Sequence, residues 1–328
     1  MRLDRRTFLQ LAAGAAASAH GAARAETYPA RTIRLVLPFP PGGAFDILGR
    51  PWADLVSRRL GTVIVENLSG AGGSLAAASV AHSPPDGYRI FLGSSAIHLT
   101  DMILRVRPLL NPMKELMPVS MLATVTFAIV VNPNVPANSL GELIAHLKAN
   151  PGKLSYGSPG AGTMNHLCGE LLKSLTGIKD LPHVAYRGAG PAITDAIGGQ
   201  IPLIIPSMTN AVLAFHRAGK LRVLAITNPT RLPIAPDIPT TEEAGVKGLV
   251  AQQLVGIFAP AGTPAPAVAR LAETNRAALA DKAYVQSLID AAVIPVADEW
   301  TAERFSRFME NEVGRWDPLV KSIGVKLD

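Results

Sequence analysis

The stretch Pro38–Asp46, PFPPGGAFD, lies between an apolar run and an amphipathic run. Thr32–Leu37 predicts a short buried strand, and the residues from Ile47 onward predict a helix. A loop that follows a parallel strand lies at the carboxyl end of the sheet, where open α/β folds bind their ligands. Gly42 and Gly43 permit positive φ and a close approach to a ligand, and the start of the next helix favours an anion. The stretch therefore predicts an α/β fold with an anion site at this loop.

Three further glycine-rich loops also lie between apolar runs. They are SGAGGS (residues 69–74), SPGAGTMNH (residues 158–166) and YRGAGP (residues 186–191). Thr163 is placed to cap the following helix, and His166, one turn later, is expected to face the loop. Together the loops predict a cleft walled by backbone amides, although glycines that serve only tight turns remain the alternative. Asp46 is equally suited to contacting a ligand and to capping its helix.

Short apolar segments alternate with helical patterns along the chain, which predicts doubly wound sheets. Ser139–Glu142 is a capping box that opens one of these helices. The expected strands are Thr32–Leu37, Thr62–Val65, Arg89–Leu92, Phe127–Val131, Leu154–Tyr156, His183–Tyr186, Leu203–Ile205, Val223–Ile226 and Gly256–Phe258.

The N-terminal 25 residues have the features of a signal peptide. Arg5–Arg6 precede an apolar run that ends at Ala23–Ala25, as in twin-arginine export signals, and the run is too short to span a membrane. Cleavage after Ala25 leaves 303 of the 328 residues, enough for two domains, in the periplasm. The formal net charge of +6 includes a net +3 from the signal, so the mature chain has no charge excess that indicates nucleic acid.

Several kinds of site are absent from the sequence. The single cysteine, Cys168, falls on the apolar face of a helix and is assigned to packing. The seven histidines form no metal motif, and neither a phosphate-binding GxxxxGK[ST] nor a GxSxG sequence occurs. Ser94, Ser95 and His98 are close in sequence, but they are interpreted as cleft lining and not as catalysts. No cofactor, metal site or catalytic group is therefore expected.

The order of these segments resembles the extracytoplasmic solute receptors of tripartite tricarboxylate transporters, the Bug family. The resemblance extends from about Tyr28 to the C-terminus. The segments that carry it are, in this order, PFPPGGAFD, VENLSGAGGS, PDGYRIFLGSSAIH, NPGKLSYGSPGAGTMNHLCGELLKSLTG, HVAYRGAGPAITDAIGGQ and GIFAPAGTP. The resemblance implies two doubly wound α/β domains of the type II periplasmic-binding-protein kind, with a ligand cleft between them. Residues 26–121 and 249–328 would form the first domain, and residues 122–248 the second.

The loops and the resemblance together indicate one set of ligand-binding residues. In the family the corresponding loops surround a carboxylate that is held by backbone groups and water. The expected ligand-binding residues are Pro40, Gly42, Gly43, Phe45, Asp46, Ser94, Ser158, Gly160, Gly162, Thr163, His166, Arg187, Gly188, Gly190, Pro191 and Ser207. Where family members often have Asp-Asn, this chain has Pro206–Asn210, which disfavours a ligand with an amino group.

The resemblance implies a monomeric periplasmic receptor for a small organic mono- or dicarboxylate. Its partners would be the large and small subunits of a membrane permease, and nucleic acid is not expected. Two other functions remain open from the sequence: a sensory receptor that docks on a signalling protein, and a carboxylate-processing enzyme.

Overall fold

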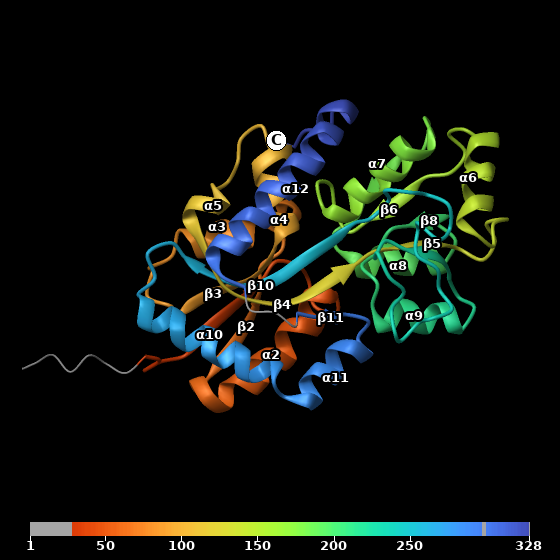
Figure 1. Ribbon diagram of the computed structural model, residues 1–328. Helices are drawn as coiled ribbons and strands as arrows, with labels where there is room; N and C mark the ends of the chain where they lie inside the picture. Colours follow the sequence, from red (N-terminus) through yellow and green to blue (C-terminus); the bar gives the residue numbers. More distant parts are fainter. Residues whose placement is uncertain (1–27, 297–299, 328) are drawn as a thin grey trace, which may run out of the picture.

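The computed structural model describes residues 28–296 and 300–327, which form two β-sheets flanked by helices (Figure 1). We call the first sheet with its helices lobe one, and the second sheet with its helices lobe two. The expected export signal, residues 1–25, lies outside the described residues. Within the described ranges, no helix is both long enough and apolar enough to cross a membrane.

Lobe one contains a mixed, six-stranded sheet. Its strands are β1 (Ile33–Leu37), β2 (Val63–Asn67), β3 (Arg89–Ser94), β4 (Leu116–Thr126), β10 (Gln252–Pro260) and β11 (Ile294–Pro295). They lie in the order β11-β4-β10-β3-β1-β2. β1 is parallel to β2 and β3, whereas β10 is antiparallel to β3 and β4.

Lobe two contains a mixed, five-stranded sheet. Its strands are β5 (Ala128–Val131), β6 (Tyr156–Ser158), β7 (His183–Ala185), β8 (Leu203–Ile204) and β9 (Arg222–Ile226). They lie in the order β7-β6-β8-β5-β9. β6 is parallel to β7 and β8, whereas β5 is antiparallel to β8 and β9.

Helices cover both sheets. Those of lobe one are α2 (Ala44–Leu60), α3 (Ser74–Ala81), α4 (Ser95–Leu99), α5 (Pro112–Glu115), α10 (Ala265–Leu279), α11 (Lys282–Asp290) and α12 (Ala302–Ile323). Those of lobe two are α6 (Leu140–Ala149), α7 (Met164–Thr176), α8 (Ala189–Ile197) and α9 (Asn210–Arg217). Two short turns, η1 (Ala71–Gly73) and the π-helical η2 (Thr100–Leu104), complete lobe one. In Figure 1, α2, α10 and α11 lie on one side of the first sheet, and α3, α4 and α12 on the other.

The chain crosses between the lobes along two paired strands, β4 and β10, which Figure 1 shows running side by side toward lobe two. Thr227 is fully buried beside the ends of these two strands, where the chain passes from lobe one to lobe two. Its backbone N–H donates to the carbonyl of Phe127 at 2.9 Å, and its hydroxyl donates to the carbonyl of Ala251 at 2.7 Å. The boundary expected between residues 121 and 122 falls within β4, because pairing with β10 continues to Thr126.

The expectation of two doubly wound α/β domains is confirmed, but the sheets are not wholly parallel. Each of the nine expected strands overlaps an observed one, whereas β4 and β11 were not foreseen. β10 was foreseen only as Gly256–Phe258, although it extends over nine residues. The antiparallel pairing of β4 with β10 has a physical reason. A strand that crosses to lobe two and a strand that returns from it must run in opposite directions when they pair.

Pro51 lies inside the first helix and does not delay its start. α2 begins at Ala44 and continues through Pro51 to Leu60. Pro51 is on the exposed side of the helix, where water can satisfy the carbonyl of Ile47 that a proline cannot pair. Trp52, on the buried side, donates from Nε1 to Oδ1 of Asn275 at 2.8 Å and so ties α2 to α10.

The larger of the two hydrophobic clusters in the described chain extends through both lobes. It contains Leu35 and Phe258 of lobe one together with Ile129, Tyr156 and Cys168 of lobe two. Cys168 is fully buried, and burial raises the pKa of its thiol to about 12. The interpretation of Cys168 as a packing residue is therefore confirmed.

Candidate ligand-binding site

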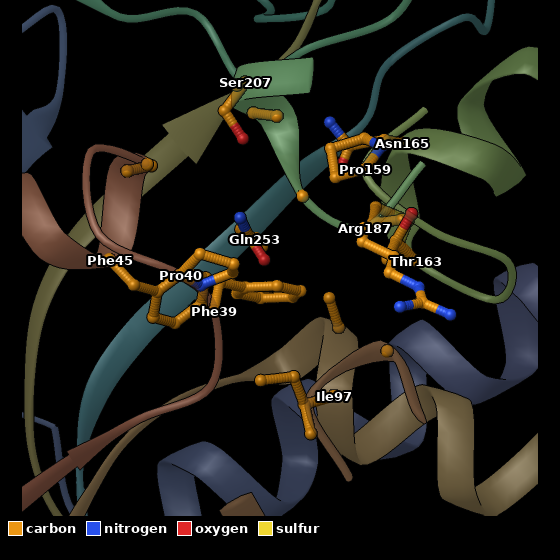
Figure 2. A pocket seen from close by; sticks show the side chains of 18 of the residues that line it. Phe39, Pro40, Phe45, Ile97, Pro159, Thr163, Asn165, Arg187, Ser207 and Gln253 are labelled. Atoms are coloured by element: carbon orange, nitrogen blue, oxygen red, sulfur yellow. The ribbon is translucent and has the colours of Figure 1, made fainter. Parts of the chain in front are cut away.

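A pocket of about 90 Å³ is walled by both lobes (Figure 2). Lobe one contributes Phe39, Pro40, Pro41, Gly43, Ala44, Phe45, Gly72, Ala96, Ile97, Thr100 and Gln253. Lobe two contributes Pro159, Thr163, Met164, Asn165, Arg187, Gly188, Ala189, Gly190, Pro191 and Ser207. None of these residues is an Asp or a Glu, so no carboxylate side chain opposes a negatively charged ligand.

Three helices from the two lobes begin at this pocket. The first residues of α2, α7 and α8 line it, and their backbone N–H groups have no acceptor within the described ranges. These residues are Ala44, Phe45, Met164, Asn165, Ala189 and Gly190. A helix N-terminus has unsatisfied N–H groups and the positive end of the helix dipole, so three of them favour an anion.

The local sequence explains why the helices begin at these positions. Thr163 is the N-cap of α7, and its hydroxyl accepts from the N–H of His166 at 3.4 Å, as predicted. Gly43 and Gly188 are the N-caps of α2 and α8. Gly188 has a φ of +108°, and an added Cβ would lie 3.4 Å from the ring of Pro40 in the other lobe. A glycine at this position therefore lets the lobes approach each other.

Asp46 stabilises the first loop and does not line the pocket. It is the third residue of α2, so it is not the N-cap. Its Oδ2 accepts from the N–H of Gly42 at 3.1 Å, and its Oδ1 accepts from Nε of Arg50 at 2.7 Å. The N-cap alternative left open by the sequence is therefore wrong, because Gly43 is the N-cap, whereas the alternative of a ligand contact stays a prediction. The carboxylate instead bonds back to the loop, as the acid of a capping box does.

Gln253 brings a polar side chain from β10 to the pocket (Figure 2). Its Oε1 accepts from the hydroxyl of Ser94 at 3.0 Å, and both residues are buried. This bond leaves the Nε2 of Gln253 as a donor for a ligand. Ser94 itself does not line the pocket, so its contribution is to orient Gln253.

Asn165 is held in a similar way on the lobe-two side of the pocket. Its Nδ2 donates to the carbonyl of Ile205 at 2.9 Å, and the residue is buried. The neighbouring walls are apolar: the rings of Phe39 and Phe45 lie 5.2 Å apart, and Ile97 faces them across the pocket (Figure 2). The pocket therefore suits a ligand with an anionic group and an apolar body.

Two stacked histidines support the loop Ser158–Thr163 from behind. The rings of His166 and His183 lie 3.9 Å apart and nearly parallel. Nδ1 of His166 accepts from the N–H of Gly162 at 3.1 Å, and Nε2 of His183 lies 2.7 Å from the hydroxyl of Ser158. Burial lowers the pKa of both rings, that of His183 to about 3, so both are neutral. His166 faces the loop, as predicted, but it does not line the pocket.

A wider vestibule of about 800 Å³ adjoins the pocket. The two cavities share Phe39, Pro40, Gly72, Pro159, Arg187 and Gly188. Arg187 is exposed where they meet, and no ion pair of its side chain is found within the described ranges. Arg105, on the vestibule wall, lies 3.2 Å from the carboxylate of Asp101 and donates to the carbonyl of Ala71.

The structure brings together nine of the sixteen expected ligand-binding residues. Those that line the pocket are Pro40, Gly43, Phe45, Thr163, Arg187, Gly188, Gly190, Pro191 and Ser207. Gly160 lines the vestibule instead. Those that line neither cavity are Gly42, Asp46, Ser94, Ser158, Gly162 and His166. Of these six, Gly42 donates its N–H to Asp46, and the other five orient or support the groups in front of them.

Some pocket residues were not foreseen. Gln253 was missed because its sequence pattern predicted only the middle of β10 as a strand. Asn165 lies two residues after the predicted cap Thr163, so its place in the first turn of the helix was a usable signal. Ile97 and Thr100 follow β3 in a segment where only Ser94, Ser95 and His98 were expected to line the cleft. Across the described part of the chain, no three His, Cys, Asp or Glu side chains are grouped to hold a metal ion.

The fold and the pocket together define a two-lobed binding protein whose ligand site lies between the lobes. The family model for the tripartite tricarboxylate transporter family receptor matches residues 48–325. The chain is 36% identical to protein BugT of Bordetella pertussis over 306 residues, 92% of each chain. The chain therefore belongs to the tripartite tricarboxylate transporter receptor family.

Solved structures agree with this membership. The periplasmic binding protein BugD has a TM-score of 0.84 and 32% identity, covering 91% of this chain and 99% of its own. Rpa4515 of R. palustris, described with adipate, has a TM-score of 0.85 and 32% identity over the same shares. MatC of Rhodopseudomonas palustris, described with bound malate, has a TM-score of 0.82 and 29% identity, covering 89% of this chain and 100% of its own.

Proposed function

We propose that this protein is a periplasmic receptor that captures a small organic carboxylate for a membrane permease of the tripartite tricarboxylate type. The observation that carries the proposal is the convergence of three helix N-termini, from both lobes, on one pocket without an acidic side chain. Such a site binds an anion through backbone N–H groups and does not require a buried arginine.

Relatives support a carboxylate as the anion. The two R. palustris structures that share this fold are described with adipate and with malate, both of which are carboxylates. The apolar walls at Phe39, Phe45 and Ile97 favour a ligand with a hydrocarbon body. The absence of an Asp or Glu among the lining residues disfavours a ligand with an amino group, in line with the expectation from Pro206–Asn210.

We infer binding without catalysis. Ser94 donates its hydroxyl to Gln253, and Nδ1 of His98 lies 3.0 Å from the carbonyl of Ser94. His98 is buried against Phe258 and Phe305, and its ring is not part of the pocket wall. The serine and histidine that are close in sequence therefore have no arrangement that would let them attack a ligand.

A thermal-shift screen on the mature protein tests the proposal. Adipate, malate and related mono- and dicarboxylates should raise the melting temperature, because a ligand that binds only the folded state stabilises it. Nucleotides and neutral sugars should leave the melting temperature unchanged. Native mass spectrometry of freshly purified protein should show a monomer and any carboxylate retained from the cell. Stabilisation by sugars or nucleotides, with no response to carboxylates, would refute the assignment.

A further inference from the structure

Lobe one contacts lobe two at Gly162, a glycine that was expected from the sequence to bind the ligand. Gly162 lies in the loop Ser158–Thr163, has a φ of +74°, and does not line the pocket. The hydroxyl of Thr100, in lobe one, donates to the carbonyl of Gly162 at 2.7 Å. A Cβ built on Gly162 would overlap the side chain of Leu327. Two groups of lobe one therefore meet at one residue of lobe two.

Leu327 belongs to a short segment after α12, which we call the C-terminal strap (Gly324–Leu327). Gly324 ends the helix in the left-handed conformation, with a φ of +66°. The strap then pairs with lobe one: the N–H of Leu327 donates to the carbonyl of Leu104, and the N–H of Val106 donates to the carbonyl of Leu327, both at 2.9 Å. The backbone of the strap is thus attached to lobe one, while the side chain of Leu327 lies on lobe two.

The strap lies beside the route to the pocket. Leu327 lines the vestibule, and α12, which precedes the strap, contacts both lobe one and α7 of lobe two. Figure 1 shows α12 between the helices of lobe one and α7. Pro159 and Thr163, on either side of Gly162, line the pocket. The loop that contacts the ligand site is therefore the same loop that receives the strap.

We propose that the C-terminal strap latches the two lobes together by placing Leu327 on Gly162, and so sets the balance between open and closed forms. A contact whose two sides belong to different lobes exists only when the lobes are together, so it stabilises only the closed form. Gly162 is suited to this contact because the absence of a Cβ leaves space for Leu327. Leu327 and Gly162 are positioning residues in this proposal, and neither touches the ligand.

The latch can be tested without a ligand. Spin labels at Asp54→Cys in lobe one and Lys220→Cys in lobe two report the distance between the lobes; both positions are exposed, and Cys168 is buried and unreactive. In this background, Leu327→Ala should lower the ratio of closed to open molecules about three- to tenfold, the effect expected for losing part of a leucine contact. Lys326→Ala, an exposed neighbour in the strap, is the matched control and should leave the ratio unchanged.

Gly162→Ala supplies an independent variant. It should displace Leu327 and open the protein in the same direction, and the double variant Gly162→Ala, Leu327→Ala should open it no further than the stronger single variant. Identical distance distributions for Leu327→Ala and wild type would overturn the proposal, as would fully additive effects of the two substitutions. Because no ligand is needed, this result is independent of whether the pocket binds a carboxylate.

Discussion

At the scale of single residues, the site depends mainly on backbone groups, and side chains hold these groups in place. Asp46 shows this most clearly, because an acid beside a proposed anion site is bonded to the N–H of Gly42 and to Arg50. Ser94 likewise orients Gln253. A polar residue next to a ligand loop is therefore as suited to bracing the loop as to touching the ligand, and sequence position does not distinguish the two.

Gln253→Glu should weaken carboxylate binding. The substitution keeps an acceptor for the Ser94 hydroxyl, but it removes the Nε2 donor and places a negative charge beside the anion. Losing a hydrogen bond to a charged group costs about 1.5–3 kcal/mol, so the dissociation constant for adipate should rise at least about tenfold at pH 7. Titration calorimetry measures this change. Gln200→Glu, which adds the same charge at an exposed position outside the pocket, is the control and should bind normally.

Arg187→Gln should distinguish acids with one carboxylate from acids with two. Arg187 lies where the pocket meets the vestibule and forms no ion pair within the described ranges, so its guanidinium is available for a second anionic group. The dissociation constant of the variant for adipate should rise roughly tenfold. Its dissociation constant for hexanoate, an acid of equal chain length with one carboxylate, should change less than about twofold.

A matched charge control accompanies this comparison. Arg58→Gln removes the same charge from an exposed position of α2 and should affect neither acid. Equal losses of affinity for hexanoate and adipate in Arg187→Gln would mean that Arg187 acts only through the overall electrostatic potential of the cleft.

At the scale of elements, the positions at which helices begin determine the ligand site more than the lengths of the helices do. The sequence identified the loops before α2, α7 and α8 because Gly, Pro and Thr punctuate the apolar patterns there. β4 was not predicted because Pro118 and Ser120 interrupt its apolar run. The strand nevertheless pairs with β10 from Leu116 to Thr126. An interrupted strand is stabilised by its neighbours, and these are known only from the tertiary structure.

Helix α4 should make the stability of the protein sensitive to acid. His98 is buried between Phe258 and Phe305, and burial lowers its pKa to about 4, below the usual value near 6.5 of an unfolded chain. The unfolded state therefore takes up a proton that the folded state does not. The neutral ring of His98 makes its full contribution to the free energy of unfolding above about pH 7. This contribution is lost as the pH falls from about 6.5 toward 4, so the free energy of unfolding should be about 2 kcal/mol lower at pH 5 than at pH 7.

Urea unfolding at pH 7 and pH 5 measures this effect. His98→Asn keeps a donor for the carbonyl of Ser94 but cannot titrate, so the variant should be less stable at pH 7 and lose less stability on acidification. Ring resonances of His98 that titrate near pH 6.5 in the folded protein would contradict the assignment of a neutral, buried ring.

At the scale of the whole molecule, the two lobes are coupled by the crossing strands, by the contacts at Gly162 and by a common hydrophobic cluster. This coupling predicts that the lobes unfold together. Trp52, Trp300 and Trp316 all belong to lobe one, so tryptophan fluorescence follows that lobe, whereas far-ultraviolet circular dichroism follows both. The two signals should give the same urea midpoint. A circular-dichroism transition with a second step would show that lobe two unfolds separately.

The sequence by itself determined the α/β class, the positions of most strands along the chain, the Thr163 cap of one ligand loop and the family resemblance. These features are local: turn residues, apolar periods and caps act within a few neighbouring positions. Only the tertiary structure decided that Gln253 reaches the pocket from an antiparallel strand, that Asp46 braces its own loop, and that Gly162 receives Leu327. Each of these depends on which distant segments pack together, because a contact across the chain is determined by the free energy of the whole assembled core and not by the residues on either side of it.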